Sequence, residues 1–197
     1  MGIRPYEPAD HDAVSHICLL TAAAGTDATG VFSSDELMPD VWARPYLAFA
    51  PEWAWVIDDG DGISGYLLAT PDTRAFVERY RAEWIPRLAP KYEHVDPPAT
   101  DDERMRHLAF VPERMLIAEV DVYPAHLHID LLPRVQGRGL GRQLIATLEE
   151  ALRAAGVGGV HLGLDPANTA ARAFYAKLGF TELASSTADE PLLAKRI

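Results

Sequence analysis

Hydrophobic residues recur with the period of strands and of helices in turn along this chain, most clearly in its last third. Residues 125–132 alternate as a strand does, and apolar residues spaced three and four apart predict a helix from Leu140 to Ala155, with Gly156 as its C-cap residue. A strand at residues 160–164 and a helix at residues 168–178 follow. A strand, a helix and a further strand in this order predict one parallel crossover in a mixed α/β protein.

The rest of the chain predicts short strands and helices separated by polar loops. We expect strands at residues 3–6, 53–57, 63–69, 180–183 and 192–197, and a hairpin sequence, Asp-Asp-Gly-Asp-Gly, joins the second to the third. The expected helices are residues 10–24 with Asp10 as N-cap, 71–88 with Pro71 at the first position, 101–109, and a short one at 36–43. Residues 115–120 are expected to be extended.

Composition is that of an ordinary globular protein with a single domain, residues 1–197. Of the 197 residues, 48% are hydrophobic and 24% charged, which is enough for a full core. The formal net charge of −11 argues against a nucleic-acid partner and is compatible with a cationic partner such as an amine or a basic peptide. No apolar run has the length of a membrane span, and the N-terminus has no signal-peptide pattern. Together with a single cysteine, Cys18, which we expect to be a buried small residue and not a nucleophile, this predicts a cytoplasmic protein without a membrane partner.

A loop rich in glycine and arginine joins the strand at residues 125–132 to the helix that follows. Residues 134–142 contain three glycines and three arginines. Glycine exposes backbone amides and admits a ligand where a Cβ would clash, and the start of the helix adds further amides and the positive end of its dipole. Arginine side chains supply cationic forks for phosphate oxygens. In an acidic chain, this local cationic group predicts a pyrophosphate site.

Other phosphate loops fit this segment less well. The dinucleotide fingerprint has a different glycine spacing, and too little chain follows for a doubly wound sheet. A nucleoside-triphosphate loop needs a Lys-Ser/Thr pair after the glycines, and the sequence has none at that position. The plain alternative is a structural turn beside a core helix.

Two motifs, in the order in which they occur, resemble those of the GNAT superfamily of acyltransferases. Arg134-x-x-Gly137-x-Gly139 matches the pyrophosphate motif of that family, and Leu131-x-Pro133 matches the end of its fourth strand. The second signature of the family is similar to Asn168-x-x-Ala171-x-x-Phe174-Tyr175-x-x-Leu178-Gly179-Phe180. The resemblance implies a mixed, mostly antiparallel sheet flanked by helices, with splayed strands four and five, and acetyl-CoA as cosubstrate.

A closer resemblance covers almost the whole chain and is to the acetyltransferase-like domain of O-GlcNAcases and its free-standing bacterial relatives. The matching segments are Ile3-Arg4-Pro5, Ala9-Asp10, Ile17-Cys18, Gly65-Tyr66, Trp84-Ile85-Pro86, Lys91-Tyr92, Asp130 and Phe174-Tyr175-x-Lys177-Leu178-Gly179. This resemblance implies a helical insertion between the third and fourth strands, at about residues 70–120. Animal members depart from the glycine motif, whereas this chain keeps it, so the resemblance favours cofactor binding by this chain.

The resemblance also implies how acetyl-CoA binds. Its pantetheine arm is expected to bond to the main chain of Leu131 and Leu132, and the amides of Gly137 to Gly141 are expected to hold the pyrophosphate. Asn168 is expected to orient the pantetheine or the end of the neighbouring strand. The full set of expected cofactor-binding residues is Leu131, Leu132, Arg134, Gln136, Gly137, Arg138, Gly139, Leu140, Gly141, Arg142, Asn168 and Tyr175. For the three arginines, plain exposure to solvent is the alternative.

Three polar residues alternate along the strand before the loop, at His126, His128 and Asp130. The spacing is similar to the H-x-H-x-D pattern of metallo-β-lactamases, but Leu131 stands where the last histidine of that pattern belongs, and we assign no metal. Hydrogen-bonded polar residues on a covered strand face are the more ordinary interpretation. For acetyl transfer, Asp130 is the first candidate general base and His128 the second, with a structural hydrogen bond of Asp130 as the alternative.

Tyr175 follows Phe174 in the helix at residues 168–178, and its position predicts a place in the core. The family resemblance implies a sharper role, as the acid that protonates the leaving CoA thiolate. The implied function is direct transfer of an acetyl group from acetyl-CoA to an amine, either a small molecule or a lysine side chain. The alternative is a non-catalytic module that binds acetyl-CoA or another protein. The sequence leaves the acceptor and the oligomeric state open.

Overall fold

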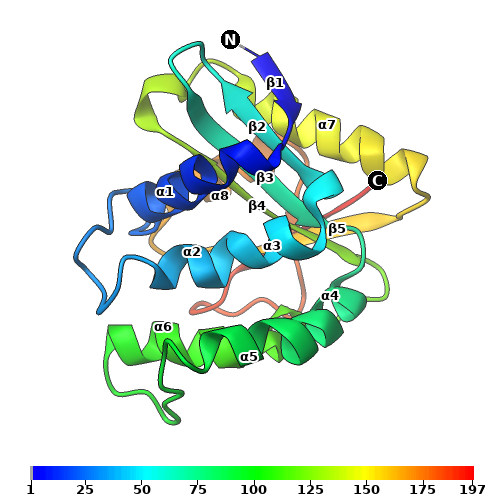
Figure 1. Ribbon diagram of the computed structural model, residues 1–197. Coiled ribbons are helices and arrows are strands. Elements are labelled where there is room, and N and C mark those ends of the chain that lie inside the picture. The colour runs from blue at the N-terminus through cyan, green and yellow to red at the C-terminus, as the bar shows by residue number, and fades with distance from the viewer. Residues whose placement is uncertain (1) are drawn as a thin grey trace.

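A seven-stranded mixed sheet forms the centre of the computed structural model, which describes residues 2–197 (Figure 1). Its order across the sheet is β1-β2-β3-β4-β5-β7-β6. Neighbouring strands are antiparallel except for β4 and β5, so the predicted parallel crossover and the mixed α/β class are confirmed. The strands are β1 (Gly2–Pro5), β2 (Ala54–Asp58), β3 (Ile63–Thr70), β4 (Ala125–Leu131), β5 (Gly159–Gly163), β6 (Thr181–Glu182) and β7 (Leu192–Arg196).

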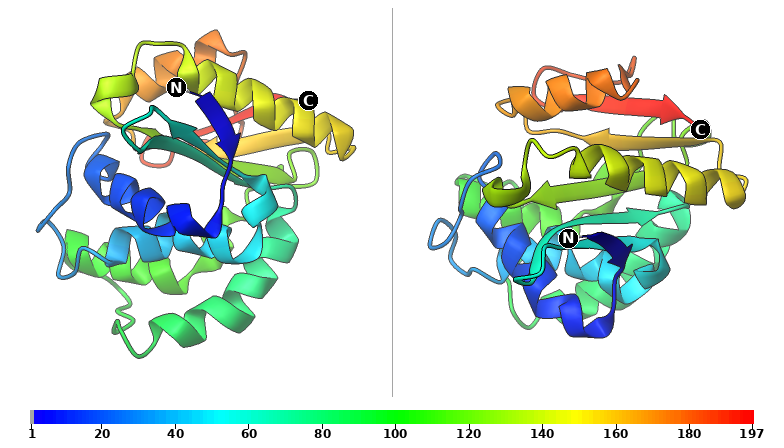
Figure 2. Two further views of the ribbon diagram at one scale, coloured as in Figure 1. Left: turned by 45° about the horizontal axis from the view of Figure 1, so that its top comes forward. Right: turned by 90° about the horizontal axis from the view of Figure 1, so that it is seen from above.

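Helices cover both faces of the sheet (Figure 2). On one face lie α1 (His11–Thr21), α2 (Leu37–Trp42) and α3 (Arg44–Phe49). The insertion between β3 and β4 contributes α4 (Thr73–Arg79), α5 (Ile85–Leu88) and α6 (Asp101–Phe110), which form a further layer below α2 and α3 in Figure 1. The other face carries α7 (Leu140–Ala154), the connection from β4 to β5, and α8 (Thr169–Lys177). The predicted helical insertion is therefore present.

Alternation along the central strands divides the hydrophobic core into two clusters. Tyr66 and Leu68 of β3 are fully buried against α1–α3 and the insertion, whereas Leu67 and Ala69 are fully buried on the α7 side. In α7, the buried residues Leu144, Leu148 and Leu152 are those that the sequence pattern predicts to face inward. The two faces of the sheet therefore present different environments, and β4 places its side chains alternately into each.

The predicted helix at residues 71–88 is present but starts later and contains a wider turn. Asp72 and not Pro71 precedes the helix: its carboxylate accepts a hydrogen bond from the Ala75 amide at 3.1 Å, so the prediction of Pro71 at the first position was wrong. One turn of π-helix, Tyr80–Trp84, separates α4 from α5. Pro86 explains the interruption, because it has no amide proton to continue the ladder of hydrogen bonds.

Three other predictions need correction. The first helix ends at Thr21, because the chain turns back through positive φ at Ala24 (52°) and Gly25 (93°). Asp10 is not its side-chain cap: the carboxylate instead accepts from the Glu7 amide and pairs with Arg4 at 2.7 Å. Residues 115–120 are not a strand, because a 3₁₀ turn, Pro112–Met115, leads into loop.

The sequence analysis did not predict α3, whereas the predicted C-cap of α7 at Gly156 is confirmed. The segment at residues 25–52 forms α3 in addition to the predicted short helix. Gly156 has φ 72°, and the Val157 amide donates to the Leu152 carbonyl at 2.9 Å, which is the arrangement expected of a glycine that ends a helix.

Candidate functional site

The glycine loop between β4 and α7 presents a row of unbonded amides. Gly137 and Gly139 have φ values of 73° and 79°, and a Cβ placed on either would meet nothing within 4 Å. Among residues 2–197, the amides of Gly137 to Gly141 donate to no carbonyl and to no side chain, and the first bonded amide of α7 is that of Gln143, to the Gly139 carbonyl. Consecutive free amides at the start of a 15-residue helix form a concave donor surface for an anion.

Gly141 has a different role from the other two glycines. A Cβ at this position would lie 3.2 Å from Cζ of Phe174 in α8. The absence of a side chain therefore allows α7 and α8 to approach closely at Phe174. Gly141 thus serves packing through its Cα and offers its amide to a ligand.

The loop side chains divide into bonded and unbonded groups. Arg134 pairs with Asp59 of the β2–β3 hairpin, with Nε 2.7 Å from the carboxylate, and holds the pKa of that carboxyl below its usual range. The Gln136 amide donates to the Leu131 carbonyl at 2.8 Å. Arg138 and Arg142 are exposed and pair with no carboxylate within residues 2–197. Arg138 and Arg142 are therefore the cations that remain available to a phosphate, whereas Arg134 and Gln136 brace the loop.

Strands β4 and β5 separate after a short contact. They pair at Ala125 with Val160 and at His126 with His161, and the remaining residues of β4, Leu127 to Leu131, have no partner in β5. The opening between the strands therefore widens toward the glycine loop. This is the splay that the family resemblance implies.

The main chain of β4 shows which of its amides face the opening. The Leu132 amide donates to the Ser64 carbonyl at 2.9 Å, and the Leu132 carbonyl accepts from the Val135 amide. Because antiparallel pairing directs every second residue toward the neighbouring strand, Ile129 and Leu131 turn their polar groups away from β3 and toward the opening. Both main-chain groups of Leu132, one of the expected contacts, are therefore occupied within the protein, whereas those of Ile129 face the opening.

Asp130 lies on the face of β4 that is turned away from α7. Segments far away in sequence enclose its side chain. Its carboxylate accepts a hydrogen bond from the hydroxyl of Tyr66, which lies directly across in β3. Burial raises the pKa of Asp130 to about 6, against the opposing hydrogen bonds of Tyr66 and Thr21. A carboxyl group with this pKa is ionised at neutral pH and is a stronger base than an ordinary aspartate.

His128, two residues before Asp130, is the end of a buried chain of hydrogen bonds (His128–Tyr46–His126–Thr73). The Thr73 hydroxyl lies 2.7 Å from the Pro124 carbonyl, so its single proton is donated there. His126 must then donate from Nδ1 to Thr73 and accept from the Tyr46 hydroxyl at Nε2, both at 2.7 Å. The Tyr46 oxygen in turn accepts from Nε2 of His128 at 3.0 Å.

This chain fixes the tautomer of His128. Its Nε2 carries the proton, and its Nδ1 keeps a lone pair. Burial is the main cause that lowers the pKa of His128 to about 3, and the charge on Arg114 adds to it. His128 is therefore neutral at pH 7 and a much weaker base than Asp130.

Tyr175 and Asn168 sit on the other wall of the opening. Tyr175 in α8 is 5% exposed and packs edge-on against Phe174 and Phe180. Its hydroxyl forms no hydrogen bond with residues 2–197, and no enclosed side-chain oxygen of this part lacks a partner, so the hydroxyl is not fully enclosed. Burial, followed by the charge on Asp130, raises its pKa. The Asn168 side chain caps α8 by accepting from the Ala171 amide at 3.0 Å.

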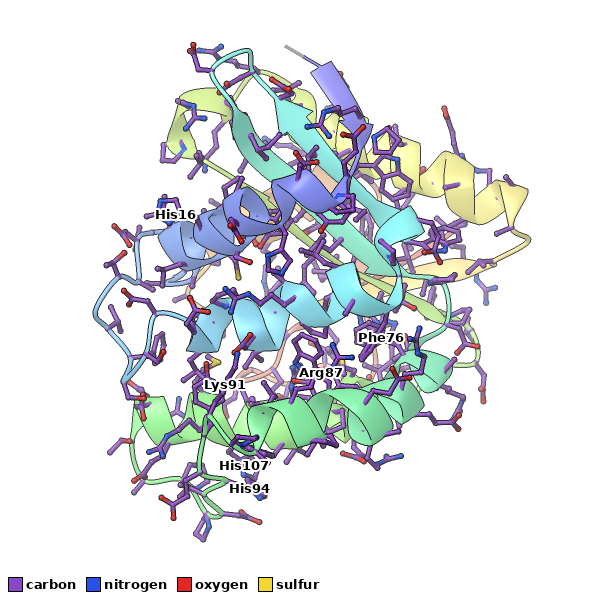
Figure 3. The ribbon with its side chains drawn as sticks, viewed as in Figure 1. His16, Phe76, Arg87, Lys91, His94 and His107 are labelled. Carbon is purple, nitrogen blue, oxygen red and sulfur yellow. The ribbon has the colours of Figure 1, made fainter. Side chains whose placement is uncertain are left out.

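Two other features, a surface depression and the single cysteine, do not indicate a reaction site. A depression of about 490 Å³ lies between the insertion and the segment before α2, but Lys91 and Arg106 in its wall pair with Asp40 and Asp102. Figure 3 shows Lys91 between the insertion helices and α2. Cys18 is buried, which raises the pKa of its thiol.

Residues 2–197 contain no group of three or more side chains placed to hold a metal ion, and both histidines of the H-x-H-x-D segment turn Nε2 to Tyr46. Within that same range, no helix is both long and apolar enough to cross a bilayer.

His126, His128 and Asp130 form the polar face of β4. Sequence reasoning missed the partners that enclose this face. Tyr66 was noted only as part of a matching segment, and Tyr46, Thr21 and Thr73 were not singled out. Tyr46 and His126 are separated by 80 residues in the chain. The pairing of β3 with β4 places Tyr66 opposite Asp130, and the packing of α1, α3 and α4 against the sheet brings Thr21, Tyr46 and Thr73 to this face. The signal available in the sequence was Tyr66, a tyrosine at an alternating position of a strand that is buried.

Comparison with known proteins identifies the class of this fold. The family model described as the Acetyltransferase (GNAT) family matches residues 26–180. The crystal structure of SsHAT is similar with a TM-score of 0.94 and 47% sequence identity, over 99% of this chain and 97% of that one. The structure of an agmatine N-acetyltransferase, with a TM-score of 0.60 at 16% identity over 100% of this chain and 99% of that one, shares the fold.

The sequence is also similar to part of much longer proteins. Protein O-GlcNAcase of Rattus norvegicus is 29% identical over 188 residues, which is 92% of this chain and 20% of the relative, and the protein of Mus musculus matches over the same share. The chain thus spans about a fifth of the length of these curated relatives. It belongs to the GNAT acetyltransferase family, whose members are acyltransferases that use acetyl-CoA as cosubstrate.

Proposed function

We propose that this protein transfers the acetyl group of acetyl-CoA directly to an amine, in a ternary complex without a covalent enzyme intermediate. The observation that carries the proposal is that two features meet at one opening in the sheet. At its wide end lies the row of free amides from Gly137 to Gly141. On β4 beside it lies Asp130, an enclosed carboxylate with a pKa of about 6.

The proposed cofactor contacts follow from the groups that are unbonded. The amides of residues 137–141 and the exposed Arg138 and Arg142 hold the pyrophosphate. The pantetheine arm bonds to the main chain of Ile129 and to the amide of Leu131, because these groups face the opening between β4 and β5 and are unbonded within residues 2–197. Arg134 and Gln136 support the loop through Asp59 and the Leu131 carbonyl. Asn168 orients the start of α8. Leu140, the first residue of α7, orients the start of that helix.

The proposed chemistry needs a base, an oxyanion donor and an acid. Asp130 accepts a proton from the amine, directly or through water, as the amine nitrogen bonds to the acetyl carbon. An amide of β4 that faces the opening stabilises the developing oxyanion. The carbon–sulfur bond then breaks, and Tyr175 donates a proton to the thiolate and is reprotonated from solvent. His128, with a pKa of about 3, stays neutral beside Asp130 and positions the acceptor through its Nδ1 lone pair.

Calorimetric titration with acetyl-CoA, with NADH as control ligand, tests the cofactor site. We expect micromolar affinity for acetyl-CoA and none for NADH. Thiol release in the presence of small amines and lysine peptides, followed by mass spectrometry of the products, then tests transfer. Binding without amine-dependent thiol release for any acceptor would contradict the enzyme assignment and favour a non-catalytic acetyl-CoA-binding module.

A further inference from the structure

Arg114 is a partly buried cation without an anionic partner. It belongs to the 3₁₀ turn Pro112–Met115 at the end of the insertion, and its Nε donates to the Leu108 carbonyl at 3.1 Å. Ten other arginines of residues 2–197 pair with carboxylates, as Arg44 does with Glu36 and Asp40. Arg114 pairs with none in that range, although the chain has a formal net charge of −11. An unpaired cation in a partly enclosed position is costly unless a ligand completes it.

The terminal nitrogens of Arg114 are unbonded within the described part of the chain and not fully enclosed. The two terminal nitrogens of its guanidinium form no hydrogen bond with residues 2–197. Every enclosed side-chain nitrogen of this part has a partner, so these terminal nitrogens are accessible. An arginine fork held at Nε, with both terminal nitrogens free, presents the geometry that binds a carboxylate through two parallel hydrogen bonds.

The guanidinium is close to the proposed reaction centre. Its central carbon lies 4.3 Å above the ring of Trp42, and that ring packs edge-on against His128 at 5.4 Å. One indole ring therefore separates Arg114 from His128, which shares a strand face with Asp130. All four side chains, those of Trp42, Arg114, His128 and Asp130, are partly exposed.

Trp42 makes the position of this cation rigid. Its indole nitrogen donates to the Met105 sulfur of α6 at 3.3 Å, while its ring lies under the guanidinium. A cation stacked on tryptophan is partly stripped of water and loses less entropy when it binds an anion. The charge on Arg114 also contributes to the lowered pKa of His128, which shows that the two groups share one electrostatic environment.

We propose that the acceptor is an amine that carries a carboxylate several bonds away, and that Arg114 binds this carboxylate while the amine approaches Asp130. The proposal rests on the proposed function and specifies its acceptor. It also modifies the expectation drawn from net charge. An acidic surface attracts an amine, but a cation beside the reaction centre disfavours polyamines and lysine-rich peptides there.

Turnover of a series of ω-amino acids and the matched n-alkylamines tests this proposal. The ω-amino acids differ in the number of methylenes between amine and carboxylate, and each alkylamine lacks only the carboxylate. We expect the best amino acid to exceed its alkylamine in kcat/KM by about 10- to 100-fold, because a charge-assisted hydrogen bond to a bound carboxylate is lost in the amine. This preference should disappear in Arg114→Met and be reduced in Arg114→Lys, which keeps the charge without the fork.

Arg87 provides the matched control. It lies 5.3 Å above the ring of Trp84, is exposed, forms no ion pair within residues 2–197, and belongs to α5 of the insertion (Figure 3). Arg87→Met should leave the preference unchanged. Thermal unfolding of each variant separates a folding defect from a binding defect, and Arg114→Lys remains informative if Arg114→Met does not fold.

A binding experiment separates this proposal from the proposed catalysis. An N-acetyl ω-amino acid, which cannot react, is titrated into the CoA-saturated protein and into the Arg114 variants. Binding that is weakened at least tenfold by Arg114→Met and not by Arg87→Met supports the carboxylate site even if no amine is turned over. Equal turnover of acids and alkylamines, or binding that is independent of Arg114, would overturn it while leaving acetyl transfer intact.

Discussion

The glycine loop and the polar face of β4 serve two parts of one proposed reaction, cofactor binding and proton transfer, and they are built in opposite ways. The loop uses backbone amides of consecutive residues, and its glycines at positions 137 and 139 have positive φ and open surroundings. The polar face uses side chains that are enclosed and hydrogen-bonded to residues up to 82 positions away, as His128 is to Tyr46. The donor surface of the loop is therefore built from local backbone, with Arg134–Asp59 as a supporting contact from a distant hairpin, whereas the face depends on the whole fold.

The largest effect is expected on the polar face. Asp130→Asn removes the proposed base, keeps the size of the side chain and its contact with Tyr66, and should lower kcat/KM by about 10²- to 10⁴-fold. Steady-state thiol release measures the loss, and calorimetry should show unchanged affinity for acetyl-CoA. Wild-type turnover in this variant would reduce Asp130 to a structural role.

The same variant has a predictable effect on stability. Burial raises the pKa of Asp130 from 3.8 to about 6, so the protonated form stabilises the fold and this contribution is lost as pH rises from about 4 to 6. Asp130→Asn should therefore be at least as stable as wild type at pH 7, by at most about 3 kcal/mol. Loss of activity in this variant then cannot be assigned to unfolding.

Gly139→Trp should abolish acetyl-CoA binding, because its side chain would enter the open space in front of the free amides. Positive φ makes any side chain unfavourable at this position, by about 1–2 kcal/mol. Gly156→Trp is the matched control, because Gly156 has φ 72° and also meets nothing within 4 Å, at the other end of α7. Equal affinity in the two variants, measured by calorimetry, would sink the assignment of the loop.

Tyr175→Phe tests the wall of the opening that faces β4. The ring still packs between Phe174 and Phe180, so the fold and the affinity for acetyl-CoA should be unchanged. We expect kcat to fall by about 10²-fold if the hydroxyl donates the proton to the thiolate. Normal turnover would return Tyr175 to a purely packing role.

Acid should unfold the protein through its buried histidines. Burial lowers the pKa of His126 and of His128 far below that of an unfolded histidine, 6.5, so each stays neutral in the fold and takes up a proton on unfolding. Stability is then lost as pH falls below about 6.5, by about 1.4 kcal/mol per pH unit for each histidine. Asp130 opposes this between pH 6 and 4, so the slope should be steeper in Asp130→Asn. Urea unfolding at several pH values measures it, and a flat profile would contradict the neutral network.

The smallest effect is expected at Gly141, where the loop meets the core. In Gly141→Ala the new Cβ would lie 3.2 Å from Phe174, so α8 must shift slightly, at a cost of about 1 kcal/mol. Its amide remains, so affinity for acetyl-CoA should change by less than about threefold. Thermal unfolding of the variant alone and with Phe174→Leu checks this, because the smaller side chain should restore stability. A large loss of affinity would assign Gly141 to the cofactor site directly.

The same comparison explains what the sequence could predict. The glycine loop, the hairpin and α7 follow from nearest neighbours and periodicity, so their positions were predicted within a few residues. The predicted end of α1 was wrong, because Ala22 to Ala24 are strong helix formers before Gly25, yet the helix already ends at Thr21. Residues 115–120 are mostly apolar but form a loop, and the apolar character of Met115, Ile117 and Val120 reflects their burial and not a strand.

The enclosure of Asp130 was beyond sequence reasoning for a physical reason. Its raised pKa depends on Tyr66 from β3 and Thr21 from α1, which meet it only when the sheet register and the helix packing are set. The occupied main chain of Leu132 likewise depends on that register. Alternation predicts which residues share a strand face, but not which distant residues cover it.

The most direct test of the account is the pH dependence of amine-dependent thiol release, with an aromatic amine that stays neutral over the range tested. The account predicts that kcat/KM rises tenfold per pH unit up to about pH 6, the pKa of Asp130, and then levels off. This rise should be absent from the residual activity of Asp130→Asn. Thiol release that is independent of the amine, or a wild-type profile shared by Asp130→Asn, would contradict Asp130 as the base for acetyl transfer.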